Sequence, residues 1–81
     1  MKNEMHLHDI VALLEDTPAL HFLTGQQLLL RRGQIGTVVM IHNSTTFEVE
    51  FAGRDGRAYV ILPVKSDKLM VLHDILEPAT A

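Results

Sequence analysis

The stretch Arg31-Arg32-Gly33-Gln34-Ile35-Gly36-Thr37-Val38-Val39-Met40-Ile41 decides the fold of this chain. Two glycines three residues apart open a β-branched run, and glycine supplies the positive φ or the bulge that bends one sheet into another. Residues 46–51 then alternate apolar and polar side chains, which is typical of a strand with one buried face and one hydrated face. A Gly53-Arg54-Asp55-Gly56 turn leads into a further strand. The pattern predicts a small, strongly bent antiparallel barrel.

The segments on either side of this run complete the predicted strand set. Residues 9–14 predict a first strand, with a helix over residues 8–16 as the competing interpretation because leucine, alanine and glutamate favour helices. Residues 59–62 predict a strand that stops at Pro63, and residues 66–68 predict a single helical turn before a last strand. We therefore expect an all-β, SH3-like antiparallel barrel of about five strands. Residues 18–31 form a long hairpin-like insertion between its first two strands.

Length, charge and composition narrow the possible functions. A chain of 81 residues has room for one domain, which we place at residues 9–73 between flexible ends at 1–8 and 74–81. The net charge of −3 argues against a nucleic-acid partner. The lack of cysteine excludes disulfides, thiol nucleophiles and cysteine-ligated metals. The sequence shows no signal peptide and no apolar run long enough to cross a membrane, so we expect a cytoplasmic protein without membrane contacts.

The order and spacing of these motifs resemble a small bacterial family, frequent in cyanobacteria, that is known as domain of unknown function 4926. The similarity covers about residues 9–72 and is carried by Asp9-Ile10-Val11-Ala12-Leu13-Leu14-Glu15-Asp16, Arg32-Gly33-Gln34-Ile35-Gly36-Thr37-Val38-Val39, Phe47-Glu48-Val49-Glu50-Phe51 and Asp55-Gly56-Arg57-Ala58-Tyr59. The resemblance implies an SH3-like barrel without established chemistry, and it implies pairing with the product of a neighbouring gene. Many members look shorter over residues 18–30. SH3-like accessory domains, such as that of the nitrile hydratase β subunit, are also similar and imply packing against a partner.

The insertion carries more apolar side chains than a surface loop normally does. It either folds down as a lid over the barrel or docks onto a second chain, and the sequence leaves both open. Our leading hypothesis is a non-catalytic protein-binding module, accessory or antitoxin-like. Its partner is another small protein, an enzyme subunit or a second copy. The expected contact residues are Leu20, Phe22, Leu23, Leu28, Leu29, Leu30, Arg31 and Arg32.

Four arginines support an alternative function from another class. If they converge, Arg31, Arg32, Arg54 and Arg57 form a basic spot that can grip phosphates. The Gly33-x-x-Gly36-x-Val38 opening also resembles the KOW element of ribosome- and transcription-associated proteins, which implies nucleic-acid binding. Pairing of these arginines with nearby carboxylates as solvated surface charge is the simpler interpretation.

The remaining acidic residues and the histidines do not form a pattern typical of a catalytic or metal site. Glu48 and Glu50 share one face of a strand, and alternation predicts that this face is hydrated. The five histidines follow no metal-ligand spacing. We therefore expect no catalytic residue, no metal and no cofactor.

Overall fold

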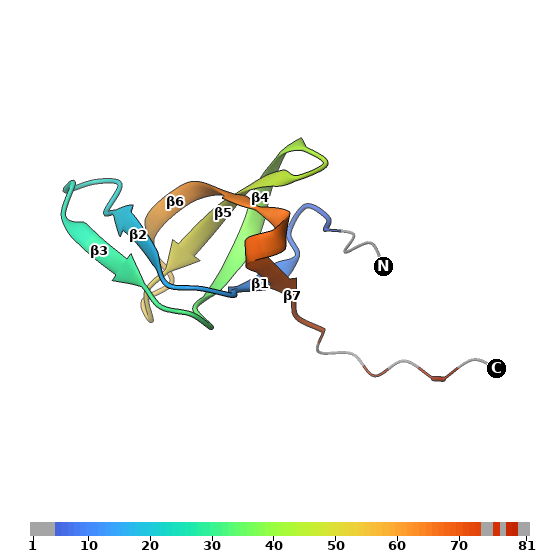
Figure 1. Ribbon diagram of the computed structural model, residues 1–81. Helices are drawn as coiled ribbons and strands as arrows, with labels where there is room; N and C mark the ends of the chain where they lie inside the picture. The colour runs from blue at the N-terminus through green and yellow to red at the C-terminus, as the bar shows by residue number, and fades with distance from the viewer. Residues whose placement is uncertain (1–4, 74–75, 77, 80–81) are drawn as a thin grey trace.

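The structure is a computed structural model that describes residues 5–73, 76, 78 and 79. Its elements are β1 (Ile10–Leu13), β2 (Thr17–Leu20), β3 (Gln27–Leu30), β4 (Ile35–Asn43), β5 (Thr46–Ala52), β6 (Ala58–Lys65), the 3₁₀ turn η1 (Ser66–Lys68) and β7 (Leu69–Val71). Five strands form an antiparallel sheet in the order β6-β5-β4-β1-β7, and β2 pairs with β3 in a separate ribbon (Figure 1). The predicted all-β barrel with an inserted hairpin is confirmed, and the competing helix over residues 8–16 is wrong.

The core lies on the inner face of the curled five-stranded sheet. On β5 the alternation predicted from the sequence holds, because Phe47, Val49 and Phe51 are all buried. The other buried side chains that pack with them come from the remaining barrel strands, from β3 and from the N-terminal segment: Met5, Val11, Leu13, Leu30, Val38, Val60, Val64 and Leu69. No polar or charged residue among those the structure describes is buried, so the core is apolar throughout that part of the chain.

The two glycines at the start of β4 have different roles. Gly33 has φ of +91° in the turn between β3 and β4, a conformation that side-chain-bearing residues rarely adopt. Gly36 lies against β5, and a Cβ atom there would come within 2.7 Å of Val49 Cγ1 and 2.8 Å of Phe51 Cε1. The first glycine therefore permits the turn, and the second lets β4 approach the core closely.

Pro63 does not end a strand, contrary to our expectation, because β6 runs on to Lys65. β6 is an edge strand, so only alternate backbone groups are needed for its ladder with β5. The Tyr59 carbonyl is bonded by Phe22 of the hairpin, whereas the Ser66 N–H bonds Thr45 beside β5. The backbone N–H and C=O groups of the odd-numbered residues of β6 therefore point away from β5. The nitrogen of Pro63 lies on that side, where its missing hydrogen costs no ladder bond.

The segment before β1 is fixed to the barrel from Met5 onward, which differs from the loose terminus that we expected over residues 1–8. Met5 is buried in the core, and the His8 N–H donates to the Val38 carbonyl at 2.7 Å. The Asp9 carboxylate accepts the His6 N–H at 2.8 Å and closes the turn. Residues 1–4, and most of the tail expected over 74–81, lie outside the described residues.

Candidate functional site: the outer face of the β2–β3 hairpin

The insertion is a two-stranded ribbon with one face toward the barrel and one face toward solvent. Thr17 pairs with Leu30 and Ala19 with Leu28, and these two pairs lie on the inner face. The alternate pairs lie on the outer face, because successive side chains of a strand point to opposite sides. They are Pro18 with Leu29 and Leu20 with Gln27. The inner face therefore covers the barrel as the lid alternative predicts, and the outer face is exposed, while docking onto a second chain stays a prediction.

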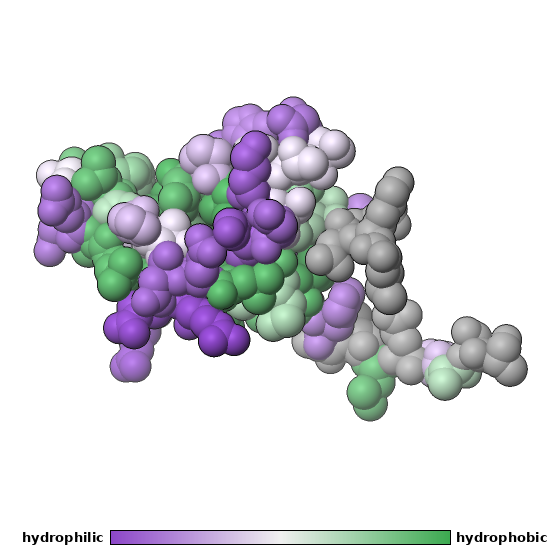
Figure 2. All heavy atoms as spheres, in the orientation of Figure 1, coloured by the Kyte–Doolittle hydropathy of each residue, from purple (hydrophilic) through white to green (hydrophobic). Residues whose placement is uncertain are grey.

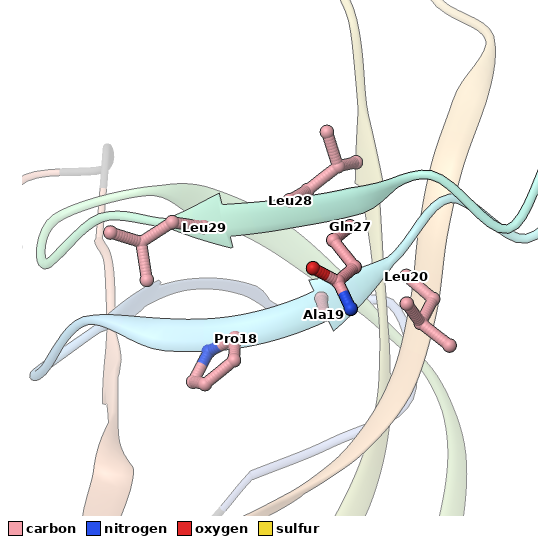
Figure 3. Close-up of a pocket in the computed structure, with 6 residues that line it drawn as sticks. All are labelled: Pro18, Ala19, Leu20, Gln27, Leu28 and Leu29. Atoms are coloured by element: carbon pink, nitrogen blue, oxygen red, sulfur yellow. The ribbon is translucent and has the colours of Figure 1, made fainter.

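The outer face is apolar and open to solvent. Leu20 is 58% exposed and Leu29 is 55% exposed. A shallow groove of about 520 Å³ follows the ribbon and is lined by Pro18, Ala19, Leu20, Gln27, Leu28 and Leu29. Figure 3 shows the side chains of Pro18, Leu20, Gln27 and Leu29 on one side of the ribbon and Leu28 pointing to the other. We call the exposed set Pro18, Leu20, Phe22, Leu23, Gln27 and Leu29 the hairpin surface.

Two of the predicted contact residues belong to the core side instead. Leu30 is 2% exposed and packs in the core, and Leu28 is half-buried against it. This placement corrects the predicted contact set, because a run of three leucines on a strand must place its middle member on the face opposite to its neighbours. Leu28 and Leu30 anchor the ribbon, and Leu29 is left exposed.

The tip of the hairpin is exposed but held in place. Phe22 is 49% exposed and Leu23 is 76% exposed. The Phe22 N–H donates to the Tyr59 carbonyl of β6 at 2.9 Å, which ties the tip to the barrel. The ring of His21 stacks on Phe22 with centroids 6.0 Å apart, and its Nδ1 accepts the Leu23 N–H at 3.2 Å. The two large apolar side chains therefore stand on an ordered turn.

The base of the hairpin is closed by one carboxylate. Asp16 Oδ1 accepts the Arg32 backbone N–H at 2.8 Å and the Arg31 Nε–H at 3.3 Å. The hydrogen bond from the Arg32 backbone is the largest cause and lowers the pKa of the Asp16 carboxyl, while desolvation, the next largest, raises it. The charge and the side-chain hydrogen bond of Arg31 and the charge of Arg32 lower the pKa further, so that it lies below its ordinary value. Arg31 is thus engaged with Asp16, and Arg32 contributes its backbone while its side chain is exposed.

The other two predicted arginines lie in the β5–β6 turn, at the same end of the barrel as the β3–β4 turn (Figure 1). The Gln34 amide donates to the Tyr59 hydroxyl at 3.2 Å and links the β3–β4 turn to the start of β6. Arg54 and Arg57 are exposed there, and Asp55 between them accepts the Arg57 N–H at 3.0 Å. The structure therefore brings the two arginine pairs to one end, with Asp16 and Asp55 among them.

One property of the hairpin surface was missed at the sequence level. No aspartate or glutamate occurs between Asp16 and Glu48, although the whole chain carries ten acidic residues. The hairpin surface therefore has only uncharged side chains, with Arg31 and Arg32 at its base. Figure 2 shows apolar surface at the left, over β2 and β3, interrupted by a hydrophilic area at the far left, with further hydrophilic surface below it.

The predicted strand face of Glu48 and Glu50 is only partly hydrated. Both residues are half-buried, and Glu48 contacts the imidazole of His42 across the β4–β5 pair. Among the residues that the structure describes, no three histidine or acidic side chains gather as metal ligands would. No helix in the same part of the chain is long and apolar enough to span a membrane.

A second exposed apolar face, on β1, β4 and β7, was also missed. Its signal is present in the sequence, because residues 10–14 are apolar without alternation, and such a run leaves apolar side chains on both faces of a strand. Ile10, Leu14, Ile35 and Met70 are each between 41% and 57% exposed there. This face is separate from the hairpin surface (Figure 1).

Comparison with known proteins gives a family and no activity. Searches of curated proteins and of solved structures gave no significant match. A family model described as Domain of unknown function (DUF4926) matches residues 7–71, which includes every strand of the structure. The chain therefore belongs to the DUF4926 family.

Proposed function

We propose that this protein is a non-catalytic binding module whose hairpin surface holds an apolar segment of an acidic partner protein. The single observation that carries the proposal is the hairpin itself, whose inner leucines are anchored in the core while its outer face stays apolar and exposed. An accessory role beside an enzyme subunit, or an antitoxin-like role against a small toxin, fits such a module. We place this role in the cytoplasm.

Burial of the hairpin surface supplies the affinity in this proposal. Covering a half-exposed leucine or phenylalanine contributes on the order of 1 kcal/mol, because the contribution scales with the apolar area removed from water. Leu20, Phe22, Leu23 and Leu29 are each 49–76% exposed. Because the ribbon is already anchored, binding has little further ordering of this segment to oppose it.

Charge selects the partner. The segment from 17 to 47 has no acidic residue, and Arg31 and Arg32 stand at the base of the hairpin. Arg31 already pairs with Asp16, so Arg32, whose side chain is exposed, supplies the positive charge that acidic groups flanking an apolar anchor would meet. This attraction favours correct encounters and register. A partner with basic groups at these positions would lack that electrostatic attraction to the base of the hairpin.

Nucleic acid is the second candidate, supported by the two arginine pairs at one end of the barrel. The arrangement favours it less than a protein partner, because Arg31 already pairs with Asp16 and Asp55 lies between Arg54 and Arg57. Nucleic-acid binding would have to weaken steeply as salt rises.

The test uses two short synthetic peptides that share a leucine face and differ in charge, one with glutamates and one with lysines at the other positions. We expect the acidic peptide to bind the full chain at least about tenfold more tightly in fluorescence anisotropy. Amide chemical shifts of residues 19–29 should change on binding.

Two lysine substitutions control the assignment of the surface. Leu29→Lys should abolish binding of the acidic peptide, whereas Met40→Lys should leave it unchanged. Leu29 and Met40 are matched in exposure, at 55% and 54%, and Met40 lies on β4 outside the hairpin. Equal binding of both peptides, or binding that survives Leu29→Lys, would contradict the proposal. Tight, salt-sensitive binding of single-stranded RNA or duplex DNA instead would favour the second candidate.

A further inference from the structure

The outer edge of β7 ends the five-stranded sheet and carries unpaired backbone groups. The Leu14 N–H bonds the Lys68 carbonyl, and the Leu72 N–H bonds the Ile10 carbonyl. The backbone N–H and C=O groups of the even-numbered residues therefore point toward β1. Those of Leu69 and Val71 point outward, away from the sheet. The Leu69 N–H bonds Ser66 within η1. Among the described residues, no hydrogen-bond partner is found for the Leu69 carbonyl or for either backbone group of Val71.

The face of the sheet beside this edge is apolar. Ala12 of β1 pairs with Ile35 on one side and with Met70 on the other, so these three side chains share the outer face. Ile10 and Leu14 lie two residues to either side of Ala12 and point the same way. Leu72 follows Met70 on this face and is half-buried. We call Ile10, Ala12, Leu14, Ile35, Met70 and Leu72 the β7 face, and Figure 2 shows apolar surface at its position, where Figure 1 places β1 and β7.

The edge is complementary to itself. In an antiparallel pair of two β7 strands centred on Val71, the two Val71 residues exchange both of their backbone hydrogen bonds. The Leu69 carbonyl then lies opposite the N–H of His73 of the second copy, the next outward position. In the same register Met70 lies opposite Leu72 of the second copy. One pairing therefore satisfies the outward backbone groups and joins two apolar faces into one.

The charges beside the edge do not oppose this pairing. No side chain of the β7 face is charged, and the charged side chains just before β7 are of both signs, since Lys68 pairs with Glu15 at 3.1 Å and also interacts with the carboxylate of Asp67. From these observations we infer that the protein forms a two-fold symmetric dimer through the β7 edge, with a continuous antiparallel sheet across the two copies. This inference concerns a surface other than the hairpin and does not depend on the proposed function.

The size of the surface sets the expected strength. A stable complex buries roughly 800 Å² of surface on each subunit. The β7 strand has only three residues, and the exposed parts of the four side chains beside it provide a smaller area; these are Ile10, Leu14, Ile35 and Met70. We therefore expect dissociation in the micromolar range, with a monomer–dimer equilibrium that depends on concentration.

Sedimentation equilibrium of the full chain, from about 10 μM to about 1 mM, tests the inference because this range spans the expected dissociation constant. The wild-type chain should pass from monomer to dimer across this range. Met70→Lys should weaken dimerisation at least about tenfold by placing a charge in the joined apolar face, whereas Met40→Lys and Leu29→Lys should dimerise as the wild type does. A wild-type chain that stays monomeric, or a Met70→Lys chain that dimerises normally, would overturn the inference.

Val71→Cys reports the register directly, because the chain has no cysteine of its own. The Cα atoms of the two paired residues would lie about 5.5 Å apart, within the range that a disulfide spans. Under mild oxidation Val71→Cys should give a covalent dimer, and Met40→Cys should not. If the two variants cross-link equally, the β7 pairing is excluded. Leu29→Lys separates the two proposals, since it should abolish peptide binding and leave the dimer intact.

Discussion

Gly36 shows that a single hydrogen atom in place of a side chain sets how closely β4 packs on β5. Its Cβ position is 2.7 Å from Val49 Cγ1 and 3.0 Å from the Glu50 carbonyl oxygen. The two side-chain neighbours belong to fully buried residues and the third is backbone, so none can move away without disturbing the core. Glycine is therefore required at position 36 because there is no room for a Cβ atom.

We predict that Gly36→Ala lowers the free energy of unfolding by about 1–3 kcal/mol, since overpacking a tight core costs that much. Urea denaturation followed by circular dichroism measures the change. Gly53→Ala is the control, because its nearest contact is the end of the Asp55 side chain at 3.3 Å. If Gly36→Ala is as stable as Gly53→Ala, the close approach of β4 to β5 is incorrect.

Asp16 gives a second prediction at the scale of one residue, which concerns its titration. The Arg32 N–H and the nearby guanidinium groups hold the pKa of Asp16 below its ordinary value. A depressed carboxyl stabilises the fold above its unfolded pKa of about 3.9 and loses that contribution as the pH falls through the folded pKa. The carboxyl ¹³C shift of Asp16 should therefore titrate below pH 3.9.

Substitution of the neighbouring arginine separates the causes of this shift. Arg31→Ala should move the pKa of Asp16 only part of the way back, because the backbone hydrogen bond from Arg32 is the largest cause and remains. An Asp16 carboxyl that titrates at its ordinary value in the wild type would show that the base of the hairpin is not closed as described.

The hairpin is the element that divides its residues between stability and binding. Leu29 and Leu30 are neighbours in β3, yet Leu29 is 55% exposed and Leu30 is 2% exposed. The same chemistry therefore has opposite consequences one residue apart, because successive side chains of a strand alternate between its faces.

Alanine substitutions at these two positions should differ sharply. We predict that Leu30→Ala lowers the free energy of unfolding by about 2–5 kcal/mol, as expected for a leucine truncated in a core. Leu29→Ala should change it by less than about 0.5 kcal/mol. Thermal denaturation of both variants beside the wild type measures the difference. A larger effect at Leu29 would mean that the register of β3 is shifted by one residue.

At the scale of the whole molecule, the sheet order brings the two ends of the domain together. β1 pairs with β4 and also with β7, the last strand of the chain. Such pairings close long loops before they gain contacts, so small β-barrels fold more slowly than helical domains of the same size.

We predict that this domain refolds in milliseconds to seconds rather than in microseconds, and stopped-flow dilution from urea measures the rate. Met70→Ala should leave the refolding rate unchanged at a concentration where the chain is monomeric, because this side chain lies on the outer face. Refolding within microseconds would contradict the expectation that long-range strand pairing, such as that of β1 with β7, limits the rate.

The sequence alone determined the class of fold and most strand positions. The alternation over 46–51, the glycines at 33 and 36 and the Asp55-Gly56 turn each depend on neighbours along the chain, and the structure confirms the elements they predicted. The sequence did not indicate which side chains of the insertion are buried, because three consecutive leucines show no apolar–polar alternation that would identify the inner face. Pro63 was wrong as a strand end, since only its place on an edge strand makes a proline acceptable.

The tertiary structure alone decided which apolar side chains are available for contact. Leu30 became part of the core, Leu28 packs half-buried against it, and Leu29 stayed exposed, because the ribbon folds back onto the barrel. That arrangement is fixed by contacts between residues far apart in sequence. The β7 face likewise exists only because β1 lies between β4 and β7 and brings Ile35 and Met70 to either side of Ala12. Hydrophobicity is a property of each residue, whereas exposure is a property of what packs beside it.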